Sequence, residues 1–271
     1  MKRMLCILLV VLFASMAFTA CDSKANAAIA GIDDLDGKKI AVQTATTSDD
    51  YVTKLLNEGT MTFEILRYEK VTQCYDELKL GRVDAILVDE VVAAGYTDVG
   101  KIVWKNSEGE PMGICLQKGN DDMTALVESL VDTCYFDGTM TALADKYFPS
   151  DVTEGVRTVA AKPTLDLTKL KTITPGKLTV GMEVGYPPME YLDKDGITKI
   201  GFDVELAKKF AELTGTELVI KNTAWDGIFA ALEKGEFDMI MSSVSITPER
   251  QAKYNLTEPY IANSLVLVVP V

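Results

Sequence analysis

The sequence predicts an α/β protein built from two similar lobes. Short apolar runs that suit buried parallel strands alternate with segments of helical spacing, both around 39–88 and around 178–241, and this alternation is typical of βαβ units. A gapless internal match is the second observation, because LKLGRVDAILVD at 78–89 aligns with LEKGEFDMIMSS at 232–243. Since a helix end, a glycine, an aspartate and a strand coincide in both copies, we expect both halves to share one plan.

Composition excludes several classes of function. The 271 residues carry 27 basic and 40 acidic side chains, a net charge of -13, which argues against a nucleic-acid partner. Histidine is absent, so Ser-His and Cys-His catalysis and the commonest transition-metal ligand are excluded. We therefore expect no metal, no cofactor and no enzymatic activity.

The first residues predict an export signal. In 1–20 two basic residues precede an apolar run, as in secretory signals. Cys21 follows Phe-Thr-Ala and resembles the lipidated cysteine of the bacterial lipobox, with Phe18 where leucine is usual. The polar, small residues of 21–33 suit a tether, so we expect a lipid anchor on Cys21 at the extracytoplasmic face of a bacterial cell membrane. A plain secretory signal with an incidental cysteine is the alternative.

The folded part divides at changes in composition and pattern. A strand near 39–42 runs into the donor-rich loop that contains Gln43 and Thr47, and a wholly apolar strand near 85–88 ends at Asp89. The expected segments are an α/β lobe over 34–117, helices over 118–148 that pack on the other lobe, a polar linker over 149–174 and a second α/β lobe over 175–271.

Three cysteines fall in the expected folded part, and the spacing of Cys74, Cys115 and Cys134 fits no metal motif. One disulfide with one free thiol, or three buried thiols, are both possible. We expect three buried thiols.

An anion-binding corner is expected at 239–250. An apolar strand there runs into Ser242, Ser243 and Ser245. Thr-Pro at 247–248 predicts a helix start, and Arg250 lies in the first turn. Hydroxyls, backbone N–H groups and a guanidinium would then converge on one point, which suits a carboxylate or phosphate. An ordinary capped helix with a surface arginine is the alternative.

The internal repeat gives this corner a partner. It places Asp89 and Ser243 at equivalent strand ends, and polar loops at 43–47 and 183–186 follow the first strand of each copy. Ligands of open α/β sheets bind at the carboxyl ends of strands, so two such rims indicate one ligand between the lobes. Arg250 suits an anion and Asp89 a cation, which together describe an α-amino acid. A helix cap is the other role open to Asp89.

These motifs resemble the extracellular amino-acid-binding proteins of ABC importers, solute-binding family 3, which includes glutamine-binding and lysine/arginine/ornithine-binding proteins. Residues 242–250 resemble the family's carboxylate-binding segment, 88–90 its ammonium-binding aspartate and 35–42 the start of its second lobe. The resemblance implies the two-lobed periplasmic-binding-protein (Venus flytrap) fold, type II. It also implies an ABC permease as partner and a monomeric receptor for a small amino acid.

The order of the segments departs from the family. Residues 176–269 resemble its beginning and 35–148 its end, which indicates a circular permutation joined by the linker. The resemblance places the cut after 265–269 and leaves one covalent crossing between the lobes, near 113–117. A chain that exchanges lobes with a second molecule is the alternative.

The resemblance also assigns roles at the site. Arg250 with Ser243 and Ser245 would hold the ligand carboxylate, and Tyr186 with Trp225 would sandwich its side chain. The ten ligand-binding residues expected are Gln43, Thr47, Asp89, Glu183, Tyr186, Trp225, Ser242, Ser243, Ser245 and Arg250.

Glu183 stands where basic-amino-acid members of the family place an acid. A carboxylate in a dry cleft needs a cationic partner, so arginine, lysine or ornithine is expected, with a polar amino acid such as glutamine as the alternative. A sensor domain, or an enzyme resembling cyclohexadienyl dehydratase with Glu183 or Glu90 as general acid, are the other readings.

Overall fold

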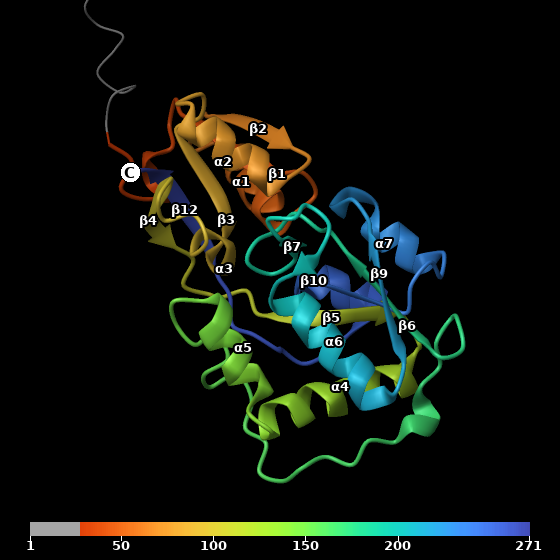
Figure 1. The fold of residues 1–271 in the computed structure, drawn as a ribbon. Coiled ribbons are helices and arrows are strands. Elements are labelled where there is room, and N and C mark those ends of the chain that lie inside the picture. Colours follow the sequence, from red (N-terminus) through yellow and green to blue (C-terminus); the bar gives the residue numbers. More distant parts are fainter. Residues whose placement is uncertain (1–27) are drawn as a thin grey trace, which may run out of the picture.

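The computed structural model describes residues 28–271, in which two five-stranded sheets form two lobes (Figure 1). The expected signal segment 1–20 and Cys21 lie outside the described residues. No helix in 28–271 is long and apolar enough to cross a membrane.

The first sheet has the order β2-β1-β3-β12-β4, with the first three strands parallel and β12 antiparallel to both of its neighbours. Its strands are β1 (Lys39–Gln43), β2 (Glu64–Tyr68), β3 (Ala85–Asp89), β4 (Gly100–Lys105) and β12 (Leu265–Pro270). The helices of this lobe are η1 (Ile32–Asp34), α1 (Thr47–Asn57), α2 (Val71–Lys79) and α3 (Glu90–Ala93).

The second sheet has the order β11-β5-β10-β6-β9. Its strands β10, β6 and β9 are parallel, and β5 is antiparallel to both of its neighbours. Its strands are β5 (Met112–Gln117), β6 (Lys177–Met182), β9 (Glu217–Asn222), β10 (Met239–Ser245) and β11 (Tyr254–Leu256), and β7 (Tyr191–Leu192) and β8 (Lys199–Ile200) form a separate hairpin. The helices here are α4 (Asp121–Phe136), α5 (Thr139–Tyr147), η2 (Leu167–Lys169), α6 (Phe202–Thr214), α7 (Trp225–Glu233) and α8 (Pro248–Lys253).

The pairing of β5 and β12 corrects the expected lobe boundaries. We expected 112–117 in the first lobe and 265–270 in the second, but β5 pairs with β10 and β11, and β12 pairs with β3 and β4. Both strands are apolar on both faces, so their sequences fit either sheet. The lobes are consequently joined by two covalent crossings, at 106–111 and 257–264, where we expected one.

These two crossings, the hinge segments, run antiparallel and bond to each other. Backbone hydrogen bonds join Asn106 N to Leu265 O at 2.8 Å, Glu110 N to Asn263 O at 2.7 Å and Met112 N to Ile261 O at 3.2 Å. The hinge is therefore a two-stranded connection.

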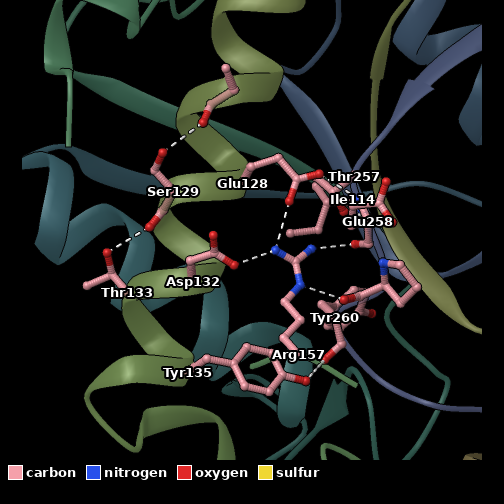
Figure 2. Close-up of polar contacts among 12 residues, drawn as sticks. Ile114, Glu128, Ser129, Asp132, Thr133, Tyr135, Arg157, Thr257, Glu258 and Tyr260 are labelled. Atoms are coloured by element: carbon pink, nitrogen blue, oxygen red, sulfur yellow. Dashed lines mark hydrogen bonds and ion pairs between the residues drawn. The ribbon is translucent and has the colours of Figure 1, made fainter. Parts of the chain in front are cut away.

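The linker is fastened to the second hinge segment, 257–264 (Figure 2). Arg157 donates from Nε to the carbonyl of Pro259 at 2.7 Å and from Nη2 to that of Glu258 at 2.6 Å. Its Nη1 forms ion pairs with Asp132 at 2.7 Å and Glu128 at 2.8 Å on α4. Only 9% of the Arg157 side chain is exposed. A segment that the sequence predicts as a plain polar connection thus holds the hinge against α4.

The internal repeat is confirmed in the structure. Gly81 and Gly235 follow the ends of α2 and α7 with φ of 67° and 71°, the left-handed conformation that glycine adopts without steric cost. Asp84 accepts from the backbone N–H of Lys39 in β1, and Asp238 accepts equivalently from Thr179 in β6, both at 2.7 Å. The repeated aspartate therefore ties the third parallel strand of each lobe to its first.

The three cysteines are buried free thiols, as expected. Burial raises the pKa of Cys74, Cys115 and Cys134 to about 12, so these thiols are unreactive at neutral pH.

Candidate functional site

All ten residues predicted to bind ligand line one cavity of about 20 Å³. Thr46 and Glu190 also line it. The two rims that the repeat predicts are therefore brought together.

Strand ends place these residues. On the first lobe Gln43 and Asp89 are the last residues of β1 and β3, and Thr47 opens α1. On the second, Glu183 directly follows β6 and Ser245 ends β10. The parallel strands of both sheets thus direct their carboxyl ends at the same space, which is where open α/β sheets bind ligands.

Hydrogen bonds across the cavity hold the lobes closed. Tyr186 donates from Oη to Asp89 Oδ2 at 2.5 Å, and Gln43 donates from Nε2 to Glu183 Oε2 at 2.6 Å. Trp225 donates from Nε1 to the carbonyl of Ala45 at 2.9 Å. A ligand would have to replace or complement these three contacts.

Arg250 is a cavity residue and not the surface arginine of the alternative interpretation. Thr247 accepts from the backbone N–H of Arg250 at 3.2 Å, which confirms the expected helix cap, and the guanidinium donates to the carbonyl of Ser245 at 3.0 Å. It lies 5.4 Å from the ring centroid of Trp225 and 5.2 Å from that of Phe229. Burial lowers the pKa of Arg250, and the nearby carboxylates oppose this effect.

Asp89 does not cap α3, since its side chain makes no cap hydrogen bond there. It is buried and accepts instead from Tyr186 and, through Oδ1, from Asn263 Nδ2 at 2.7 Å. Burial raises the pKa of Asp89 although both hydrogen bonds and Arg250 act in the opposite direction. A cationic group in the cavity would stabilise the ionised form.

Several buried polar atoms at the cavity have no partner. Among the buried side-chain atoms of residues 28–271, Glu183 Oε1, Glu190 Oε2 and Ser243 Oγ accept and donate no hydrogen bond, and Tyr75 Oη is the other such atom. Leaving a buried polar group unpaired costs free energy. Three of these four atoms belong to residues that line one cavity.

Two residues at the cavity and its rim have strained backbone conformations. Ser243 with φ of 53° and Ala45 with φ of 61° are the non-glycine residues of the described chain that have positive φ. Such conformations cost roughly 1–3 kcal/mol and cluster at functional sites. Ala45 lies in the 43–47 loop that carries Gln43 and Thr47, so both rims hold a strained residue.

Sequence reasoning missed Glu190 and misassigned Glu90. Glu190 is fully buried, accepts from Ser242 Oγ at 2.6 Å, and has a pKa that burial raises well above its usual value. Its position four residues beyond Tyr186, shortly after the predicted loop, is the signal that was available. Glu90 forms an ion pair with Lys105 at 2.6 Å at the surface and lies outside the cavity, so it is not a candidate general acid.

The second lobe carries a recognisable family sequence. Residues 178–271 match the model of the bacterial extracellular solute-binding proteins, family 3. This segment is a family 3 solute-binding domain. The α/β fold with two lobes is thereby confirmed. Arg250, the serines, Glu183 and both aromatic residues lie in the family 3 domain, whereas Gln43, Thr47 and Asp89 lie outside the matched segment.

Curated relatives match the family 3 domain over a similar length. The L-cystine-binding protein TcyJ of Escherichia coli K12 is 37% identical over 94 residues, 35% of this chain and 35% of the relative. The arginine-binding protein 1 of the same strain is 33% identical over 92 residues, 34% and 37% of the two chains. Among solved structures, the arginine-bound form of domain 1 from TmArgBP is 32% identical, covers 35% of this chain and 80% of that chain, and has a TM-score of 0.31. This chain spans about a third of the length of the curated relatives it matches.

Proposed function

We propose that this protein is the amino-acid-binding receptor of an ABC importer and holds an L-amino acid between its lobes. One observation carries the proposal: Arg250 and Asp89 line the same cavity from opposite lobes. The α-carboxylate would bind Arg250 with Ser243 and Ser245, and the α-ammonium would bind Asp89. Because both lobes contact the ligand only when they are closed, binding would favour the closed form, which a membrane permease could recognise.

A basic amino acid is the proposed ligand class. The cavity lining holds the carboxyl groups of Asp89, Glu183 and Glu190 against the guanidinium of Arg250. Burial raises the pKa of Glu183, while the hydrogen bond from Gln43 acts in the opposite direction, and Oε1 has no partner. The charged side chain of arginine, lysine or ornithine would supply that partner.

The remaining features of the proposal follow from the sequence. Residues 1–20 would be a signal, and a lipid on Cys21 would hold the protein at the outer face of the cell membrane. The lobe order would be circularly permuted, with 149–174 as the joining linker. The protein would act as a monomer, with both sheets completed within one chain.

A thermal-shift screen of the purified mature protein against all amino acids tests the proposal. A ligand at about a hundred times its dissociation constant adds roughly 2.7 kcal/mol to the free energy of unfolding. Arg250→Ala should abolish the shift with every ligand, and Glu183→Gln should weaken only the cationic ones. Lys253→Ala, on the exposed side of the same helix, is the matched control. A shift by neutral amino acids alone would reject the role of Glu183.

A dehydratase is the second candidate, because Glu183 is a buried acid with a raised pKa. Incubation with a prephenate-like substrate, followed by absorbance of the aromatic product, tests this. Turnover that Glu183→Gln abolishes and Glu90→Gln retains would favour the enzyme. Absence of turnover together with a ligand-induced thermal shift would favour the receptor.

A further inference from the structure

Glu110 in the first hinge segment contacts Ser245, which is proposed to hold the ligand carboxylate, and Thr47, which lines the cavity from the other lobe. Its Oε2 accepts from Thr47 Oγ1 at 2.8 Å and from Ser245 Oγ at 2.9 Å, one residue from each lobe. Arg250 is the third member of this group, the carboxylate clamp, and its charge acts on Glu110. Backbone pairing of Glu110 with Asn263 fixes the side chain at this place on the hinge.

The carboxylate clamp is therefore already occupied by a carboxylate of the protein. A hydroxyl has one proton, so Thr47 and Ser245 cannot donate to a ligand carboxylate while they donate to Glu110. The charge of Arg250 is likewise partly neutralised. For a ligand carboxylate to be bound with full strength, Glu110 must move away or take up a proton.

We propose that Glu110 competes with the ligand carboxylate and thereby sets how strongly the site prefers an amino acid over the corresponding carboxylate-free amine. This inference rests on the proposed function. With ionised Glu110 in place, Asp89 and Glu183 still attract cations, so a diamine keeps its binding groups while an amino acid loses one of its own. Neutral Glu110 frees the hydroxyl protons and the guanidinium for the ligand.

The surroundings of Glu110 let it change charge near neutral pH. Burial raises its pKa to about 7, Asp89 adds to this increase, and the two hydroxyls and Arg250 oppose it. The adjacent groove that Glu110 also lines carries charges of both signs, from Asp50, Lys54, Glu108, Glu249 and Lys253. A ligand carboxylate beside Glu110 would raise this pKa further, so amino-acid binding should take up a proton at pH 7.

Titration calorimetry with two matched pairs tests the inference: lysine against 1,5-diaminopentane, and arginine against agmatine. Glu110→Gln should bind the amino acid about tenfold more tightly or better, as expected for removal of a competing charge-assisted contact, and should leave the amine unchanged. Repeating the titrations in buffers of different ionisation enthalpy should show proton uptake for the amino acid in the wild type and none in Glu110→Gln. Glu108→Gln, exposed in the same segment, is the control and should behave as the wild type.

Two outcomes would overturn the inference. Equal weakening of amino acid and amine by Glu110→Gln, with no proton uptake in the wild type, would show that Glu110 only braces the hinge. Absence of binding by any amino acid or amine to the wild type would reject the proposed function and this inference with it. The comparison of proton uptake between the amino acid and its amine needs no variant. Asp89 and Glu183 meet the cationic groups of both ligands, so the difference reports on Glu110 even if Glu110→Gln does not fold.

Discussion

Replacement of Arg157 by alanine should destabilise the protein through the hinge. Arg157 makes two short bonds to the carbonyls of Glu258 and Pro259 and is nearly buried. A hydrogen bond to a charged group contributes about 1.5–3 kcal/mol, and one of the two carbonyls can turn to water. The ion pairs with Asp132 and Glu128 add little, because those carboxylates are 36% and 26% exposed. We expect a loss of about 2–3 kcal/mol.

Calorimetry of the ligand-free protein measures this loss. For a chain of this size 1 kcal/mol corresponds to about 2–4 °C in the melting temperature, so Arg157→Ala should melt about 4–12 °C lower. Arg157→Lys keeps the charge but not the planar fork and should recover less than half of the loss. Lys162→Ala, exposed in the same linker, should melt as the wild type. If Arg157→Ala also melted within 1 °C of the wild type, the linker would not hold the hinge.

Two further predictions concern glycines and pH. Gly201 has φ of 130°, and a Cβ there would lie 2.2 Å from the carbonyl oxygen of Met189, so Gly201→Ala should cost several kcal/mol of unfolding free energy in urea denaturation. Gly227→Ala in α7 meets nothing within 4 Å and should instead stabilise by about 0.5–1 kcal/mol; the opposite order of the two midpoints would contradict the placement. Burial raises the pKa of Asp203 to about 7 from 3.8, so the folded state holds this proton more tightly than the unfolded state. The contribution of Asp203 to stability should therefore be greatest in acid and fall as pH rises from about 4 to 7. Asp203→Asn should remove this contribution and so change the slope of melting temperature against pH over this range, whereas an unchanged slope would refute it.

The sequence predicted which residues line the cavity because its signals are local. Each rim is a strand that ends in polar residues before a helix, and the ungapped match around Gly81 and Gly235 aligned the two rims without knowledge of the packing. Thr247 as helix cap was equally readable, since capping depends on neighbours in the chain.

What the sequence did not predict depends on contacts between distant segments. The exchange of β5 and β12 between the sheets is a matter of pairing partners more than a hundred residues apart, and their uniformly apolar residues fit either sheet. Nothing in the sequence distinguishes Glu110 from the other acidic residues. Only the pairing of the hinge segments brings it to Thr47 and Ser245. Arg157 lies in a polar linker without a recognisable motif, and all of its partners lie outside that linker.

The fastened hinge leaves a short pivot. Arg157 and Val152 bind the second hinge segment as far as Ala262, so only Asn263 and Ser264 lie between the fastened part and β12. Asn263 donates from its side chain to Asp89, and its carbonyl accepts from the backbone of Glu110. Asp89, which is proposed to hold the ligand ammonium, and Glu110, which is proposed to compete with its carboxylate, are thus both bonded to Asn263. Ligand binding at these residues would therefore act directly on the hinge, without an intervening helix or strand.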